Sequence, residues 1–386
     1  MNRNFQAVKS IINDKIFGWS TNRKLLIIES DDWGAIRTSD KASYLKLEEA
    51  GYDMALSCYN LDALESNSDL SELYSVLNKH VDINGRPACF TANIVTANPD
   101  FKAISDCGFE TYIYESVDTT CQRVTNSDQV INLWNQGLDA KVFIPQMHCR
   151  EHLRYWEWMN RLYQGDKETV DTFLLKMCGL PAATSRSKMS FFKTPYVTED
   201  ILNKNSISMS ELITPGFQIF NKIFSFMPSS VVAPNVGWTD ETERVWASLG
   251  VQYIQGGRVQ VIDGLSRRRF KQHYLGQKNK HNMMYLVRNC TFEPAKGPKF
   301  DQHSALRQIC KAFDSNKPAI ITSHRVNYIS RIKENNRSRS LTQLDDLLKV
   351  VKKMYPNVEF ISSHELGEII RKENKSNSSK LAEIGL

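Results

Sequence analysis

The chain has 386 residues, of which 41% are hydrophobic and 24% are charged. This composition is typical of a folded globular protein and excludes an intrinsically disordered one. The net charge of +6 is small for this length, and no recognisable nucleic-acid-binding module accompanies the short arginine tracts, so we expect no nucleic-acid partner.

No apolar run approaches the roughly 18 residues needed to cross a bilayer, and Met1 to Lys24 lacks the continuous apolar stretch of a secretion signal. We therefore expect no membrane span and a cytoplasmic location. The eight cysteines show no paired spacing and are expected to be reduced thiols. The oligomeric state stays open at this stage.

Short apolar runs alternate with amphipathic segments, a pattern that predicts a largely parallel α/β sheet or barrel. A first helix is expected over Asn4–Gly18. The predicted strands are Leu25–Ser30, Ala88–Ile94, Lys141–Ile144, Ser230–Val232, Val251–Ile254, Met283–Val287, Ala319–Thr322 and Val358–Ile361. The predicted helices between them are Leu70–His80, Asp128–Gly137, Asp240–Leu249, Gln302–Phe313 and Leu341–Met354.

Three segments depart from this alternation within what we expect to be a single domain over 1–386. Residues 153–228 have few strand signals and are interpreted as a helical insertion. Residues 257–300 are expected to be irregular, and the polar tail 373–386 is expected to fray. The helices predicted in the first segment are Arg154–Leu162, Glu168–Met177 and Met209–Phe226.

Two adjacent aspartates, Asp31 and Asp32, follow the first predicted strand. Neighbouring side chains of a strand point to opposite faces, so both reach one site only if the backbone bends, and Gly34 permits a bend. The alternative is that one of the pair caps the next helix. Glu29 shares a strand face with Asp31 and is a second candidate for its role.

His148 and His152 follow the strand predicted at Lys141–Ile144. On a helix, two histidines four residues apart project from nearly one face and can bind one metal ion, although a structural pair is the commoner explanation of this spacing. His324 ends another predicted strand, where a lone histidine is again more often structural. Because sites collect where strands give way to loops, the three strand ends together favour one shared site.

In their order and spacing these motifs resemble the polysaccharide deacetylase family, the carbohydrate esterase family 4 that includes chitin deacetylases and NodB-type enzymes. Asp31-Asp32-Trp33-Gly34 resembles the family's Asp-Asp-Gly motif with one residue inserted. His148 and His152 match its His-x-x-x-His motif, and Thr322-Ser323-His324 approximates its Leu-x-His motif. The resemblance covers residues 24–370 and implies a distorted (β/α)7-type barrel of the NodB kind with a helical insertion.

By position, the resemblance implies that Asp31 is the general base and His324 the general acid. Asp32, His148 and His152 would bind a divalent metal, for which we favour zinc, with cobalt, nickel, manganese or iron as alternatives. The implied reaction removes an acetyl group from an amino sugar or another carbohydrate, on water that the metal activates.

The family's third motif, Arg-x-Pro-Tyr, has its best counterpart in Val232-Ala233-Pro234-Asn235, where the arginine is absent. Asn235 is the candidate oxyanion donor, and Trp33 and Arg325 complete the candidate substrate-binding residues. Arg288 or Arg325 is expected to orient the base. The sequence Lys193-Thr194-Pro195-Tyr196 matches the Arg-x-Pro-Tyr motif more closely, but it is not followed by the helix that follows this motif in the family. Thr322 replaces the leucine of the family's Leu-x-His motif, so the sequence does not predict which sugar or which acyl group is the substrate.

Two alternatives remain at this stage. His148 to His152 also spells H-x-x-E-H, the signature of certain zinc metallopeptidases, with Glu151 as base and Glu211 as third ligand. A catalytically inactive barrel that only binds glycan is the other. The aromatic segment Tyr155–Trp158 either stacks on sugar rings or packs in the core.

Overall fold

The computed structural model describes residue 14, residues 16–264 and residues 268–383. Within this part of the chain, nine strands form one sheet in which every pairing is parallel. The order is β10-β7-β6-β5-β2-β1-β12-β11, and β13 pairs with the first residues of β1. The strands are β1 Lys24–Trp33, β2 Phe90–Val95, β5 Phe143–Cys149, β6 Ser230–Val232, β7 Tyr253–Gly256, β10 Met284–Val287, β11 Cys290–Thr291, β12 Ala319–His324 and β13 Val358–Phe360.

The sheet is strongly curled. Its two ends in the hydrogen-bonded order are β10 and β11, yet only Arg288 and Asn289 separate these strands along the chain. The two edges of the sheet must therefore approach each other, as in a barrel that is left open at one seam. This confirms the predicted parallel α/β architecture, while the strand count differs from the seven that the family resemblance implied.

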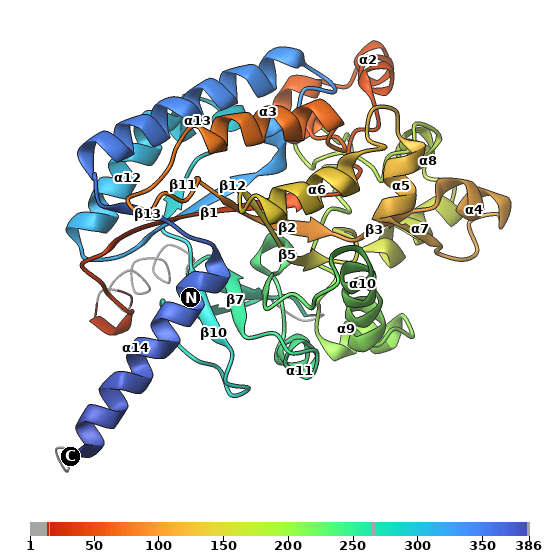
Figure 1. The fold of residues 1–386 in the computed structure, drawn as a ribbon. Coiled ribbons are helices and arrows are strands. Elements are labelled where there is room, and N and C mark those ends of the chain that lie inside the picture. The colour runs from red at the N-terminus through yellow and green to blue at the C-terminus, as the bar shows by residue number, and fades with distance from the viewer. Residues whose placement is uncertain (1–13, 15, 265–267, 384–386) are drawn as a thin grey trace.

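Helices surround the curled sheet (Figure 1). In that view α3, α12 and α13 lie above β1 and β12, and α9, α10 and α11 lie below β1 and β2. The helices are α2 Lys41–Glu49, α3 Asn67–Asn78, α4 Phe101–Asp106, α5 Val117–Arg123, α6 Val130–Asp139, α7 Tyr155–Tyr163, α8 Lys167–Leu174, α9 Glu199–Lys204, α10 Met209–Phe224, α11 Asp240–Ser248, α12 Gln302–Asp314, α13 Glu334–Met354 and α14 Ser363–Glu383.

Both faces of the first half of β1 are apolar, since successive strand side chains point to opposite faces. Leu25, Leu26, Ile27 and Ile28 of β1 are fully buried in the main apolar cluster. Inside the curl, however, polar side chains are buried and bonded to one another. Buried polar groups are stable only when their hydrogen bonds are satisfied, so this interior holds its members in defined positions near the strand ends.

The long connection between β5 and β6 contains α7, α8, α9 and α10 and, in the described residues, no strand. The segment 257–300, expected to be irregular apart from a strand at Met283–Val287, contains that strand as β10 and, in addition, an antiparallel hairpin and β11 of the main sheet. The hairpin pairs β8 (Val259–Ile262) with β9 (Arg269–Gln272), and a second small hairpin pairs β3 (Ala97–Pro99) with β4 (Tyr114–Ser116).

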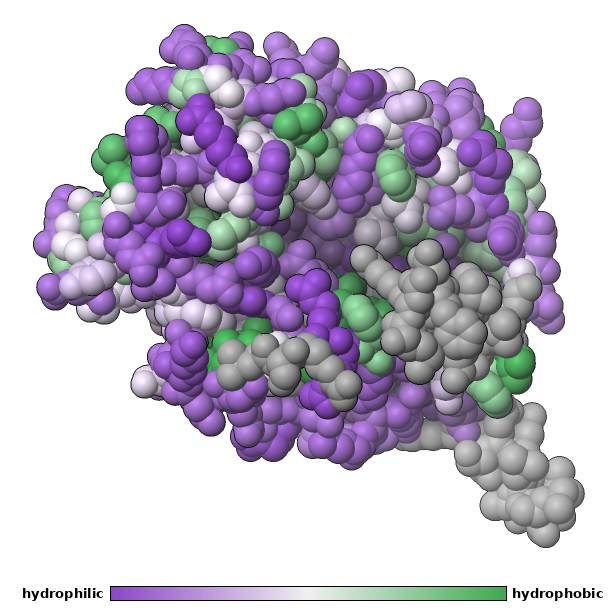
Figure 2. All heavy atoms as spheres, turned by 180° about the vertical axis from the view of Figure 1, so that it is seen from behind, coloured by the Kyte–Doolittle hydropathy of each residue, from purple (hydrophilic) through white to green (hydrophobic). Residues whose placement is uncertain are grey.

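Two predictions about the termini have different outcomes. The helix predicted at Asn4–Gly18 lies mostly outside the described residues. The tail was predicted to fray, but it is helical as far as Glu383. It forms the end of α14, which extends away from the body of the molecule (Figure 1). No helix in the described ranges combines the length and apolarity that crossing a membrane requires. The face drawn in Figure 2 is mostly hydrophilic, with its apolar side chains scattered over several places.

Candidate functional site

The chain bends at the end of β1 so that both aspartates reach one site. Asp32 has a φ of 75°, and the pairing register with β2 shifts between Ser30 and Trp33. An aspartate tolerates this left-handed conformation better than most residues. Gly34 follows with a φ of 88°, and a Cβ there would lie 2.5 Å from the Val95 carbonyl oxygen. The predicted bend is thus present, and Asp32 itself makes it.

Asp32, His148 and His152 form the one group of three potential metal ligands found among the described residues, with ligand atoms within 4.8 Å of one another. All three side chains are buried. His148 lies on β5 and His152 in the loop that follows, so the helical spacing argument was wrong about the geometry. The strand end and its loop nevertheless place the two rings 5.2 Å apart.

The donor atoms of this group fit a cation. The Nδ1–H of His148 donates to the Val232 carbonyl at 2.8 Å, which leaves its Nε2 lone pair 3.3 Å from Asp32 Oδ1. Asp32 Oδ1 and His152 Nδ1 are buried without any hydrogen-bond partner. Burial and the nearby Arg37 lower the pKa of His152 to about 3, so its ring is neutral. One carboxylate oxygen and two imidazole rings are ligands that suit zinc.

The second oxygen of Asp32 is held by an arginine that the sequence did not single out. Arg37 lies 3.2 Å from Asp32 Oδ2 and 3.1 Å from Asp62 Oδ2. Burial would raise the pKa of Asp32, but Arg37 and His148 hold it well below its usual range. The Arg37 guanidinium also lies 4.5 Å from the Phe192 ring. Asp32 is therefore a fixed, ionised carboxylate with one free oxygen.

Arg288, which lies between β10 and β11, holds the Asp31 carboxylate in place. The Arg288 guanidinium contacts both of its oxygens, at 2.7 and 2.8 Å, and its Nε donates to Glu29. Burial would raise the pKa of Asp31, but Arg288 keeps it well below its usual value. Arg288 was one of the two arginines expected to orient the base, and it does contact Asp31.

The polar interior of the barrel supports this pair. Asn93 of β2 donates to Asp31 Oδ1 at 2.8 Å and to the Gln255 side-chain oxygen at 2.9 Å. Glu29 accepts from Ser363 Oγ at 2.6 Å, and burial raises the pKa of Glu29. Because Glu29 is fully buried and turned toward Arg288, it orients the arginine and does not replace Asp31 at the cavity.

His324 ends β12 opposite Asp31, with its Nε2 4.0 Å from Asp31 Oδ2. Its Nδ1 is hydrogen-bonded to the carboxylate of Glu293, which lies just beyond β11. Burial alone would lower the pKa of His324, but Glu293 raises it above the ordinary value. Asn327 donates to the other Glu293 oxygen at 2.8 Å. A histidine whose pKa is raised and an aspartate whose pKa is lowered thus face each other across the site.

These groups border one cavity of about 850 Å³ at the carboxyl ends of the strands. Residues from 181–194, from the loop 232–237 and from the described parts of the β8–β9 hairpin also line it. Charged and polar lining side chains include Asp31, Asp32, Arg37, Tyr59, His148, His152, Arg154, Lys193, Asn235, Asp263, Arg268, Arg288, Thr322 and His324. Asn235 and Thr322 therefore lie where the sequence expected them, and their roles stay predictions.

Trp33 and Arg325 do not lie at the cavity, and their assignment to substrate binding is corrected. The Trp33 side chain is fully buried, donates to Ser30 Oγ at 3.0 Å and packs on Phe143. Arg325 is fully buried between Asp62 and Glu65, and Glu65 in turn accepts from the Gly34 N–H. Both residues stabilise the turn behind Asp32.

The groups required by the metallopeptidase alternative are engaged elsewhere. Glu151 forms a bidentate ion pair with Arg150, at 2.5 and 2.6 Å. Glu211 is exposed and caps α10 through Ser208. The aromatic segment Tyr155–Trp158 packs in the core, since Trp158 is fully buried and Tyr155 stacks on Tyr112 at 4.2 Å.

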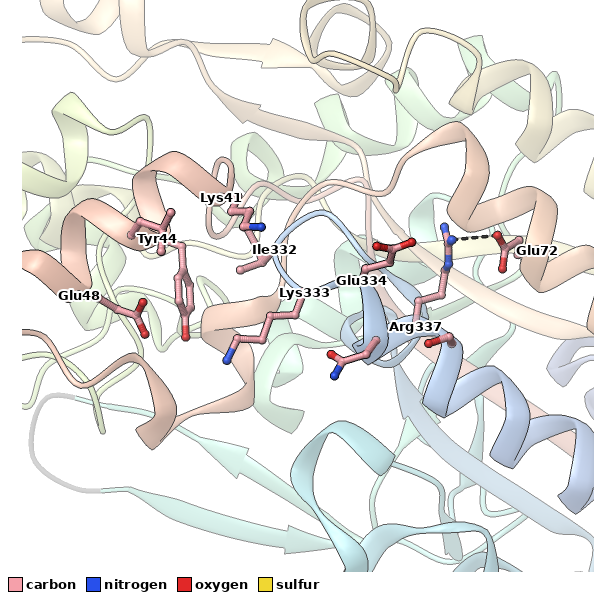
Figure 3. A pocket seen from close by; sticks show the side chains of 11 residues that line it. Lys41, Tyr44, Glu48, Glu72, Ile332, Lys333, Glu334 and Arg337 are labelled. Atoms are coloured by element: carbon pink, nitrogen blue, oxygen red, sulfur yellow. Dashed lines mark hydrogen bonds and ion pairs between the residues drawn. The ribbon is translucent and has the colours of Figure 1, made fainter.

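A second hollow, of about 740 Å³, lies on the outside of the helical layer between α2 and α13 (Figure 3). Its charged side chains alternate in sign, and Arg337 is paired with Glu72 at 2.8 Å. Lys333 lies 5.6 Å from the Tyr44 ring. Among the described residues, no group of three potential metal ligands lies there.

Sequence reasoning missed Arg37, Asn93 and Glu293. Asn93 carried a usable signal, because a polar residue in the middle of an apolar strand must find a partner when buried. Arg37 lies in a loop, and Glu293 follows a strand of only two residues, which is too short for any periodicity to mark it.

No family model and no curated protein matches this chain. It is similar to a solved candidate polysaccharide deacetylase from Mycobacterium smegmatis, with 12% identity over 92% of this chain and 93% of that one and a TM-score of 0.43. A CE4 family pseudoenzyme from Bacillus anthracis is similar at 10% identity over 90% of this chain and 66% of that one, with a TM-score of 0.38.

A GH57-type branching enzyme from Pyrococcus horikoshii overlaps as well, at 7% identity over 89% of this chain and 70% of that one, with a TM-score of 0.44. Polysaccharide deacetylases are thus among the solved structures to which the chain is similar, in line with the motif resemblance. At TM-scores of 0.38 to 0.44 these overlaps transfer no residue's role, and the function is argued from the site.

Proposed function

We propose that the protein is a metal-dependent hydrolase that removes an acetyl group from a carbohydrate, with an amino sugar as the first substrate to test. One observation carries the proposal: a free aspartate oxygen and two imidazole rings converge on one point, beside an aspartate whose pKa is lowered and a histidine whose pKa is raised. Two groups whose environments push their pKa values apart are the usual sign of an acid–base pair.

Asp32, His148 and His152 would hold the cation, which leaves a coordination position open for substrate or water. Bound there, a divalent metal such as zinc would polarise the acyl carbonyl and make the nearby water more acidic. The Arg37 contact with Asp32 Oδ2 keeps the other oxygen directed at this point.

Asp31 is the proposed general base. Its carboxylate is ionised throughout the neutral range because Arg288 lowers its pKa, and the bidentate contact fixes both oxygens. A base must lie within hydrogen-bond reach of the proton that it removes. Asp31 lines the same cavity as the three candidate ligands, so it can take a proton from the attacking water.

His324 is the proposed general acid. Glu293 accepts from Nδ1, which fixes the ring and leaves the Nε2–H directed toward Asp31 at 4.0 Å. A protonated Nε2 in this position can give its proton to the departing amine or alcohol. Asn235 is the proposed donor to the oxyanion; it lies directly after β6 with a φ of 53°.

The test is acetate release from a panel of acetylated sugars by zinc-loaded protein. We expect release to be lost in Asp31→Asn while zinc binding is retained, because Asp31 belongs to no ligand set. Glu151→Gln is the matched control, since Glu151 is a buried carboxylate on the same segment as the histidines but is paired with Arg150. Release by Asp31→Asn at the wild-type rate would refute the assignment.

The inactive glycan-binding alternative rested on the arginine missing from the third motif. The Arg288 contact with Asp31 supplies a cation for the base from another strand and removes that reason. A binder has no need for an acid and a base with opposed pKa shifts, so the hydrolase is the better-supported function.

A further inference from the structure

Five charged side chains form a continuous chain of ion pairs at the cavity wall. Lys193 contacts Glu157 at 2.9 Å, and Glu157 contacts Arg154 at 3.0 Å. Arg154 contacts Asp263 at 2.9 Å, and Asp263 contacts the Nε of Arg268 at 3.4 Å. The chain therefore links helix α7, the segment that follows α8, and the β8–β9 hairpin, which are three pieces of the long connections.

The two ends of this chain are cations with unused hydrogen-bonding capacity. Arg154 in the middle is buried and contacts both carboxylates. At the ends, Lys193 and Arg268 each have one carboxylate partner among the described residues, and their side chains are 38% and 61% exposed. Both line the cavity. An exposed ion pair contributes little to stability, so these ends are free to exchange a weak partner for a ligand.

More cationic than acidic side chains line the cavity, and Glu29, Asp62 and Glu157 pair with Arg288, Arg37 and Arg154 from behind the lining. Its lining contains five cationic side chains, Arg37, Arg154, Lys193, Arg268 and Arg288, against three carboxylates, Asp31, Asp32 and Asp263. A bound divalent cation would add to this excess. A concave surface lined by one sign of charge concentrates ligands of the opposite sign.

The same part of the wall can also accept a sugar ring. Phe192 and Phe270 line the cavity next to Lys193 and Arg268 in sequence. Half-buried aromatic rings offer flat apolar faces that pack on the C–H face of a pyranose. Cations beside aromatic faces therefore match a saccharide that carries an anionic substituent.

We propose that the cavity is selective for an acidic saccharide, a sugar bearing a carboxylate or a phosphate, which Arg268 and Lys193 recognise. This inference rests on the proposed deacetylase function and names its substrate class. A guanidinium binds either anion through paired hydrogen bonds, and the removal of one such charge-assisted contact costs about tenfold or more in affinity.

The experiment uses the zinc-loaded full chain and matched sugars. N-acetylglucosamine 1-phosphate is compared with methyl N-acetylglucosaminide, and a glucuronate-containing N-acetylated disaccharide with its glucose analogue. Binding is measured by calorimetry and turnover by acetate release, at low salt and at about 0.5 M salt, where charge interactions are screened.

We expect the acidic member of at least one pair to bind about tenfold tighter, with the ratio falling at high salt. Which pair responds identifies phosphate or carboxylate as the anion. Arg268→Ala and Lys193→Ala should each reduce the ratio of the affinities for the acidic and the neutral sugar. Arg269→Ala, an exposed arginine on the same hairpin that does not line this cavity, should leave it unchanged.

Equal affinity for both members of both pairs, or a ratio that Arg268→Ala and Lys193→Ala leave intact, would overturn the selectivity. This outcome together with acetate release would leave the deacetylase function standing. Tighter binding of the acidic sugar with no acetate from any substrate would support the recognition and refute the proposed reaction.

Discussion

Replacement of Arg288 by methionine tests the proposed base most severely. The change leaves Glu29 and Asp31, two buried carboxylates on one strand face, without their shared cation. Loss of one partner of a buried ion pair typically costs about 3–5 kcal/mol. With an unfolding entropy of about 2.1 cal/mol/K per residue, 386 residues give roughly 0.8 kcal/mol/K, and we expect the Tm to fall by about 4–6 °C.

The same variant should lose activity through the pKa of Asp31. In the wild type this pKa is depressed, so its stabilising contribution is present above the unfolded value near 3.9 and is lost as the pH falls through the folded value. In Arg288→Met, burial dominates and raises the pKa. The acid limb of the pH–rate profile for acetate release should therefore move to higher pH.

Arg288→Lys and Glu29→Gln separate catalysis from stability. Lysine keeps the charge but not the two-pronged contact, so we expect an intermediate Tm and a fall in kcat of about 100-fold, the usual size of a small misplacement. Glu29→Gln leaves the Asp31 contact intact and should change kcat less than tenfold. Wild-type kcat/KM in Arg288→Met, or equal losses in all three variants, would refute the reasoning.

Three further predictions use the other charged groups of the site. Glu293→Gln should move the alkaline limb of acetate release to lower pH, because burial then lowers the pKa of His324. In the wild type, the contact of His324 with Glu293 stabilises the fold below pH ~6.5, and this contribution is lost as the pH rises through the raised pKa of His324. Urea unfolding of the variant should show that the contribution is gone. Zinc at 100 times its Kd should stabilise the wild type by about 2.7 kcal/mol, and His148→Gln should remove this effect in thermal unfolding. Glu151→Gln should retain acetate release despite a lower Tm, because its ion pair with Arg150 is structural; loss of all activity would favour the peptidase.

The parts of the fold that could be predicted from sequence are those with strong periodicity. Apolar runs in the sequence predicted the strands β1, β2 and β12. The helices α10 and α12 also lie close to their predicted ranges. Length alone did not decide which strands were found, because the apolar strands β6, β7, β10 and β13 have only three or four residues and lie at predicted positions. The two-residue strand β11 and the hairpin β8–β9, whose strands mix polar with apolar residues, escaped detection.

The site was predictable where a polar residue ends an apolar strand. Asp31, Asp32, His148 and His324 all meet at one cavity, since the carboxyl ends of parallel strands lie at one end of the sheet. Trp33 and Arg325 adjoin these residues in sequence, but Trp33 follows the bend at Asp32 and Arg325 begins a 3₁₀ turn after β12. Both side chains are buried away from the cavity. Glu293 and Arg37 depend on tertiary contacts from loops, which no local pattern encodes.

The central claim is that Asp32, His148 and His152 bind one metal ion. Crystals grown with zinc would test it through an anomalous difference map recorded at the zinc absorption edge. One strong peak about 2.0–2.2 Å from Asp32 Oδ1 and from a ring nitrogen of each histidine is the predicted result. A peak elsewhere, or none in protein that releases acetate, would contradict it.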